Sequence, residues 1–139
     1  MGKFDFEFDT EFTRQLERLS DYDNIAPKIL EGSVAILEWY VKAETAKHKD
    51  TGDMYKSVKA GKPNKNEYGW YVSVYPRGND SKGVRNMDKM AHLEFGYIDK
   101  SGKQVAPKPI LTKALNDARD EVTEKMQELF NEVVKGLWM

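Results

Sequence analysis

The sequence contains no cysteine, which excludes disulfides, thiolate zinc sites, iron–sulfur clusters and cysteine nucleophiles. It also lacks a long hydrophobic run. The longest nearly apolar stretch, Val34 to Ala43, carries Glu38 and Lys42 and is too short to cross a bilayer. The opening MGKFDFEFDTEF is polar and acidic, unlike the basic region and apolar run of a signal peptide. We therefore expect a soluble protein without a membrane segment.

Histidine is scarce, and the glycine motifs that bind phosphate are missing. The two histidines, His48 and His92, have neither a cysteine partner nor the helical pair spacing of zinc proteases, so we expect no bound metal. No GxGxxG or GxxxxGK[ST] motif occurs, and we expect no cofactor. On a strand, His92 and Glu94 would share a face and could act as an acid/base pair, whereas on a helix they would not. Because no nucleophile-and-base pattern accompanies them, we expect a structural role and no enzymatic activity.

The chain has 139 residues, which is the size of a single domain covering residues 1–139. Its 22 basic and 23 acidic side chains nearly balance but are unevenly distributed. Residues 1–31 hold 8 acidic and 4 basic side chains (net −4), whereas residues 42–91 hold 11 basic and 6 acidic ones (net +5). This asymmetry suits either contact with nucleic acid or head-to-tail packing of identical subunits.

Helical periodicity predicts two helices in the first third of the chain. Thr10 can cap a short helix that ends near Leu19. Asp23 or Asn24 can cap a longer helix with Pro27 in its first turn, ending near residues 47–49. The apolar surface of the longer helix is broad and predicts a central helix packed on more than one side. It comprises Ile25, Ile29, Val34, Ile36, Leu37, Tyr40 and Val41.

An antiparallel hairpin is predicted next. The strongest strand signal runs from Tyr68 to Tyr75, where Trp70, Val72 and Val74 alternate with Tyr71, Ser73 and Tyr75. The preceding GKPNKNEYG is typical of a loop, and Val58 and Ala60 before it begin a partner strand. Phe4, Phe6 and Phe8 also alternate with acidic residues, and this segment could complete a sheet in its own subunit or in a neighbouring one.

The last third of the chain contains one ambiguous segment and one clear helix. MDKMAHLEFG can be a helix capped by Asn86, with Met87, Met90, Ala91 and Phe95 inward and Gly96 as its stop, or a strand; we expect the helix. YIDKSGKQVAP predicts two extended arms around a turn. From Pro109 to Gly136 an apolar stripe predicts a long amphipathic helix, and we expect Leu115, Val122 and Leu129 to lie in the core.

These elements do not alternate as βα units, so the predicted fold class is α+β. We expect a small antiparallel sheet, made of a hairpin and short strands, packed against two long helices, with a shorter N-terminal helix.

Three segments resemble a known family. DTGDMYKSV (Asp50 to Val58) is similar to a D-T-G-x-L-x-x-S-I stretch, and AHLEFG (Ala91 to Gly96) to an A-x-x-x-E-F-G-T stretch. APKPILTKAL (Ala106 to Leu115) is similar to an A-x-P-F-L-x-P-A-L stretch that leads into a last helix. In this order they resemble the tail-component, or tail-completion, proteins of long-tailed bacteriophages and prophages, over about residues 25–136. Three positions depart from the pattern: Tyr97 replaces a Thr or Ser, Ile110 a Phe and Lys113 a Pro.

The resemblance implies a small non-enzymatic α+β protein at the head–tail junction or the upper end of the tail. It implies a ring, commonly a hexamer, whose partners are the tail-tube protein and the head connector or stopper proteins. DNA would pass through the lumen with at most non-specific contacts. The protein would be found in the bacterial host cytoplasm during assembly and then in the virion. The residues that match the family pattern are Asp50, Thr51, Gly52, Ser57, Ala91, Glu94, Phe95, Gly96, Pro107, Pro109 and Leu111.

Several of these residues have a physical role that the sequence leaves open. Thr51 and Gly52 suit a tight turn, and Glu94 could accept hydrogen bonds from the backbone of that turn or pair with a lysine. Pro107 and Pro109 stiffen an arm that could reach a neighbouring subunit or pack within its own.

Basic residues of the middle region are candidates for an interface. They are Lys56, Lys59, Lys62, Arg77 and Arg85. The alternative function is a nucleic acid-binding module that uses basic side chains and aromatic rings of residues 42–91.

Overall fold

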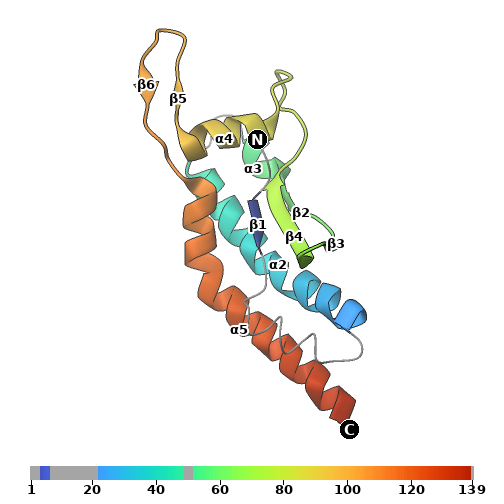
Figure 1. Ribbon diagram of the computed structural model, residues 1–139. Helices are drawn as coiled ribbons and strands as arrows, with labels where there is room; N and C mark the ends of the chain where they lie inside the picture. Colours follow the sequence, from blue (N-terminus) through green and yellow to red (C-terminus); the bar gives the residue numbers. More distant parts are fainter. Residues whose placement is uncertain (1–3, 7–21, 49–51, 139) are drawn as a thin grey trace.

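The computed structural model describes residues 4–6, 22–48 and 52–138 (Figure 1). It confirms the α+β class. The short helix predicted from Thr10 to Leu19 lies outside the described residues. The elements in chain order are β1 (Phe4–Phe6), α2 (Tyr22–Ala46), α3 (Asp53–Ser57), β2 (Val58–Ala60), β3 (Asn64–Asn66), β4 (Gly69–Pro76), α4 (Asn86–Phe95), β5 (Tyr97–Ile98), β6 (Gln104–Val105) and α5 (Ile110–Trp138).

Strand β4 organises the main sheet, because β1, β2 and β3 all pair with it in antiparallel orientation. The pairing of Val58 with Pro76 confirms the predicted hairpin, whereas Asn64–Asn66 form β3 within the segment that was expected to be a loop. Of the two alternatives for the N-terminal segment, residues 4–6 complete the sheet of their own chain, because β1 pairs with β4. Phe8 lies outside the described residues.

Helix α2 is the central element of the fold. It contacts β2 and β4 on one side and α5 on the other (Figure 1). The prediction of a helix packed on more than one side is therefore confirmed. Helix α5 packs along α2 and against α4, so its predicted contact with the second helix is confirmed, while no extended contact with the hairpin forms. The largest fully buried apolar side chains are Ile29, Leu30, Leu37, Val58, Val72, Val74, Met90, Ile110, Val122 and Met126.

Each long helix passes one of its predicted ends, and α2 stops at Ala46, just before the predicted end near residues 47–49. Helix α2 already includes Tyr22, so Pro27 lies inside it rather than in its first turn. Helix α5 continues past Gly136, because a glycine lowers helix propensity by about 1 kcal/mol without forbidding helical angles. Val122 is buried as predicted, whereas Leu115 and Leu129 are only half-buried at the edge of the core.

The ambiguous segment forms the helix α4, which ends at Gly96 as predicted. Met87, Met90 and Ala91 are buried, but Phe95 is exposed, which corrects its expected inward position. Glu94 lies one turn after Met90 and occupies the inward position in the last turn of the helix. The predicted arms then form the two-stranded β5–β6 hairpin.

Candidate functional site

The segments that resemble the tail-completion family meet at one end of the molecule. Helix α3 packs against α4, and α4 packs against α5 (Figure 1). The segment that connects α4 to α5 contains β5 and β6, and it starts and ends where these two helices meet. We call the contact region between the end of α4 and the start of α5 the junction.

Glu94 is the centre of the junction. Its buried carboxylate accepts hydrogen bonds from the backbone N–H groups of Leu111 (2.7 Å) and Thr112 (3.0 Å) and from the Thr112 hydroxyl (2.5 Å). These N–H groups belong to the first turn of α5, where no intrahelical acceptor is available. Glu94 therefore caps α5 from another helix, and a negative charge at this position suits the helix dipole. Neither sequence-based alternative included this contact. Among the described residues no lysine pairs with Glu94, and Thr51 of the turn lies outside them.

Gly96 and the prolines shape the base of the β5–β6 hairpin. Gly96 has φ = 76°, and a Cβ atom there would lie 2.7 Å from the Val105 carbonyl oxygen and 3.2 Å from Pro107 Cδ. The Lys108 N–H donates to the Leu93 carbonyl at 2.6 Å, which joins the returning strand to α4. Pro107 lies beside Gly96 of the same chain but remains exposed, and Pro109, also exposed, directly precedes the first turn of α5.

A charged network next to the junction joins α2 to α5. The buried Glu44 carboxylate of α2 accepts from Lys47 Nζ at 2.7 Å and from Lys113 Nζ at 2.9 Å, and Lys113 also pairs with Asp117 at 2.7 Å. The hydrogen bonds from Lys47 and then Lys113 lower the pKa of Glu44. The hydrogen bonds to Asp117 and then Glu44 raise the pKa of Lys113. Lys113 departs from the family pattern, and here it ties the end of α2 to the start of α5.

The first family-like segment is described only in part. Asp50 and Thr51 lie outside the described residues. Gly52 has φ = 87° at the start of α3, which agrees with the predicted turn, and its carbonyl accepts from the Lys56 N–H. The Ser57 hydroxyl donates to the Met54 carbonyl and so closes the last turn of α3.

The five basic candidate-interface residues have different surroundings. Lys56, Lys59 and Lys62 are exposed on and beside β2. Arg77 is engaged within its own chain, because its guanidinium lies 4.2 Å from the centre of the Tyr75 ring and donates to the Tyr75 hydroxyl. Arg85 is exposed, 3.9 Å from Asp88.

Other lysines of residues 42–91 pair with carboxylates inside the subunit. Lys65 Nζ lies 2.7 Å from Asp23, and Lys89 Nζ lies 2.9 Å from Asp80. The hydrogen bond from Lys65, followed by that from Trp70 Nε1, lowers the pKa of Asp23. The positive charge of the middle region is thus partly neutralised within the subunit.

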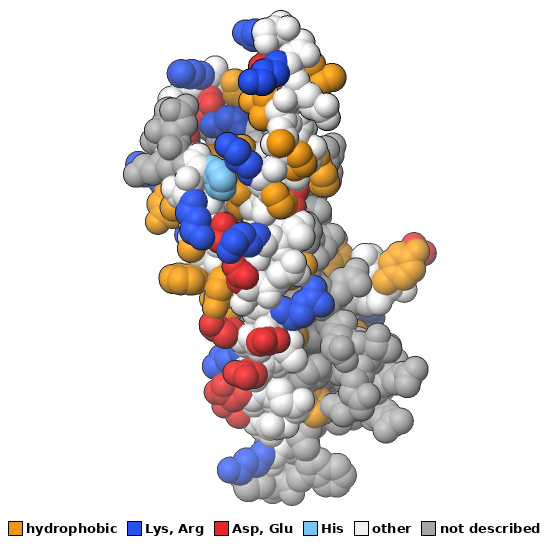
Figure 2. All heavy atoms as spheres, turned by 90° about the vertical axis from the view of Figure 1, so that its left-hand side faces the viewer, with side chains coloured by type: hydrophobic (Ala, Val, Ile, Leu, Met, Phe, Trp, Pro, Cys, Tyr) orange, Lys and Arg blue, Asp and Glu red, His pale blue; other side chains and the backbone are white. Residues whose placement is uncertain are grey.

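The β5–β6 hairpin carries apolar side chains on its surface. Tyr97 and Ile98 are exposed, as is Phe95 at the end of α4. The His92 ring is exposed and stacks on Tyr97 with 5.1 Å between the ring centres. Figure 2 shows basic and apolar side chains at the hairpin end of this face and acidic ones gathered below its middle.

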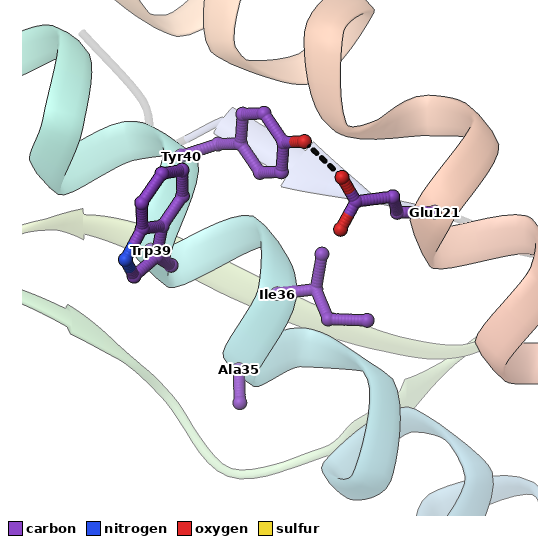
Figure 3. A pocket seen from close by; sticks show the side chains of 5 residues that line it. All are labelled: Ala35, Ile36, Trp39, Tyr40 and Glu121. Atoms are coloured by element: carbon purple, nitrogen blue, oxygen red, sulfur yellow. Dashed lines mark hydrogen bonds between the residues drawn. The ribbon is translucent and has the colours of Figure 1, made fainter.

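A groove between α2 and α5 was not anticipated from the sequence. It has a volume of about 260 Å³ and is lined by Ala35, Ile36, Trp39, Tyr40 and Glu121 (Figure 3). Trp39 is 65% exposed and packs edge-on against Tyr40, whose hydroxyl donates to Glu121. This hydrogen bond raises the pKa of Tyr40. A tryptophan outside the predicted apolar stripe of this helix was the available signal.

Among the described residues, neither histidine side chain takes part in the hydrogen bonds to Glu94. His92 is exposed on α4 while Glu94 is buried, so the helix does not bring them together as an acid/base pair. His48 is half-buried just after α2. Among residues 4–6, 22–48 and 52–138, no group of three or more His, Asp or Glu side chains could hold a metal ion. Within the same ranges, no helix has the length and apolarity needed to cross a membrane.

Comparisons with known proteins give no family assignment. No protein-family model matches the chain, and no curated protein and no solved structure is significantly similar to it.

Proposed function

We propose that this protein is a structural subunit of a phage or prophage particle. It acts without catalysis at the head–tail junction or the upper end of the tail. There it forms a ring, of six copies, that contacts the tail-tube protein and the head connector or stopper proteins. The observation that carries this proposal is the junction. Glu94 and Gly96 from one family-like segment and Pro107 and Leu111 from another lie in direct contact there, so the resemblance corresponds to one spatial unit.

The surface of the subunit also supports assembly. Exposed apolar side chains and lysines gather at the hairpin end of one face, and acidic side chains gather below the middle of that face (Figure 2). A ring needs heterologous contacts, in which one surface meets a different surface of the neighbour, and separated charges of opposite sign favour them.

The proposal is tested by measuring the mass of the protein in solution, alone and mixed with either the tail-tube protein or the head connector protein encoded in the same genome. Alone in dilute buffer we expect a monomer or weak oligomer, because one small interface does not outweigh the entropy lost on association. In the mixture we expect a closed ring on the end of the tube. If the protein associates with neither the tube nor the connector, the proposal is wrong.

Charge reversal of the lysines beside β2 tests one docking surface. Changing Lys56, Lys59 and Lys62 together to Glu should impair head–tail joining and leave the fold intact, since all three side chains are exposed. Joining at wild-type efficiency would exclude this surface from docking.

A salt titration of DNA binding addresses the alternative. We expect weak binding that falls steeply with salt, because each neutralised phosphate releases a counterion. Submicromolar binding at about physiological salt would instead favour the nucleic acid-binding function.

A further inference from the structure

The β5–β6 hairpin stands away from the body of the subunit (Figure 1). Its apolar side chains find little cover there, since Ile98 is 72% exposed and Phe95, at its base, is 63% exposed. A two-stranded ribbon is marginally stable by itself in water, and exposed apolar side chains that cluster mark interaction sites. The hairpin therefore has the properties of a docking element.

The tip of the hairpin is held in shape by Asp99. Its carboxylate accepts hydrogen bonds from the N–H groups of Ser101 (2.9 Å) and Lys103 (3.0 Å) and from the Ser101 hydroxyl (2.6 Å). The Asp99 N–H donates to the Lys103 carbonyl across the turn. This network orders the tip before any partner binds, which lowers the entropy cost of docking.

The charge of the hairpin is opposite to that of the outer part of α5. Residues 97–108 contain three lysines, Lys100, Lys103 and Lys108, and one acidic residue, Asp99, so their net charge is 3 − 1 = +2. Within the part of the chain that the structure describes, these lysines form no ion pair. Residues 117–132 contain six acidic and two basic residues, so their net charge is 2 − 6 = −4.

The groove between α2 and α5 offers an apolar floor beside these carboxylates. Ile36 and the exposed Trp39 ring line it, and Glu121 forms its α5 side (Figure 3). Its volume of about 260 Å³ is below the roughly 300–1,000 Å³ of small-molecule pockets. An apolar side chain on a narrow basic hairpin matches this groove in both polarity and charge.

We propose that the β5–β6 hairpin of one copy docks into the α2–α5 groove of a second copy, with Ile98 against Ile36 and Trp39. Lys100 and Lys103 then face the carboxylates of α5. The hairpin does not reach its own groove. Leu111, at its base, precedes Glu121 by ten residues, about 15 Å along α5, and the hairpin points away from that helix (Figure 1). The contact is heterologous, and it rests on the proposed function in that it specifies how ring subunits join.

Disulfide trapping provides a direct test, because the native chain has no cysteine to give a background. An Ile98→Cys variant is mixed with an Ala35→Cys variant under mild oxidation, and the mixed disulfide dimer is quantified. The control replaces Ile98→Cys by Tyr68→Cys, since Tyr68, at the β3–β4 turn, is at least as exposed as Ile98 and lies outside the hairpin. We expect the Ile98–Ala35 pair to form mixed dimers in clear excess over the Tyr68–Ala35 pair. Equal yields from the two pairs at every protein concentration would overturn the docking proposal.

A chain carrying both Ala35→Cys and Ile98→Cys separates this proposal from the proposed function. Head-to-tail docking yields a ladder of covalent oligomers that ends at the closed ring. A reaction that stops at the dimer would support hairpin docking but would contradict the ring.

Charge exchange between the hairpin and α5 tests the electrostatic part of the docking proposal. Restored association in the exchanged pair could not result from misfolding of either variant. Reversing Lys100 and Lys103 to Glu should weaken self-association by about 10-fold, and reversing Glu121 and Glu124 to Lys in the partner copy should restore it. Ile98→Ser should weaken association by about 10- to 100-fold with no change in the thermal midpoint, because the side chain is exposed in the single subunit. Unchanged association in Ile98→Ser, or a charge exchange without rescue, would overturn hairpin docking and leave tube binding as the separate test of function.

Discussion

The capping of α5 by Glu94 leads to a quantitative prediction for Glu94→Ala. The substitution leaves the backbone N–H groups of Leu111 and Thr112 without their acceptor. An unsatisfied buried donor costs about 1–3 kcal/mol, and loss of a helix cap costs about 0.5–2 kcal/mol. Because the two contributions overlap, we expect the free energy of unfolding to fall by about 1–4 kcal/mol, a substantial share of the roughly 5–15 kcal/mol of a typical domain.

Urea denaturation followed by circular dichroism measures this loss, with the midpoint shifted and the slope unchanged. Glu94→Gln should lose less, because its amide oxygen retains an acceptor for α5. Glu124→Ala, an exposed substitution on α5, the helix that Glu94 caps, serves as the matched control and should remain within about 0.5 kcal/mol of wild type. A double-mutant cycle with Thr112→Val should give a coupling of about 1 kcal/mol, since the Thr112 hydroxyl also donates to Glu94.

The capping argument fails if Glu94→Ala costs no more than Glu124→Ala. It also fails if hydrogen exchange of the Leu111 amide is equally slow in wild type and Glu94→Ala. Either result would mean that the first turn of α5 does not depend on the carboxylate.

Three further predictions concern stability. Gly96→Ala should destabilise the fold by more than the roughly 1–3 kcal/mol of backbone strain, because its Cβ would also clash with a carbonyl oxygen 2.7 Å away. Gly102 has φ = 84° and open space around it, so Gly102→Ala should show the backbone strain alone when the two variants are compared in thermal melts. The hydrogen bond from Lys89 is the main cause that lowers the pKa of Asp80 from 3.8 to about 2. The ionised carboxylate therefore stabilises the fold above the ordinary pKa, and this stabilisation is lost as the pH falls. The advantage of wild type over Asp80→Asn in unfolding free energy should shrink between about pH 4 and pH 2. Leu37→Ala should lower the free energy of unfolding by about 2–5 kcal/mol, because Leu37 is fully buried. Leu115→Ala should cost clearly less, because Leu115 is only partly buried, and equal shifts in the urea midpoint would contradict this ranking.

The elements with regular hydrophobic periodicity were predicted well from the sequence. Val72 and Val74 identify β4 because alternation along a strand depends only on the pleat. The long helices are identified in the same way, since one face of each is buried. These patterns are local, so they can be recognised without knowing which element packs against the helix or strand.

The errors arose where a distant residue decides the outcome. Glu94 belongs to a family-like segment of the sequence, but its hydrogen-bond partners lie 17 and 18 residues away in a helix whose orientation no local pattern specifies. Phe95 was expected inward because it is apolar, whereas the inward position in its turn belongs to a carboxylate that caps another helix. The groove at Trp39 needs both α2 and α5, so no single segment predicts it.

The closure of the hairpin at its base has a consequence for loop length. The Leu93–Lys108 hydrogen bond and the Glu94–Leu111 hydrogen bond fix both ends of the intervening segment against the body of the subunit. The entropy of closing such a loop grows only with the logarithm of its length, by about 0.6 kcal/mol per doubling. Residues 97–106 can therefore be lengthened, shortened or exchanged with little effect on the rest of the fold. This makes the hairpin a region in which related chains can differ in partner while they keep the same core.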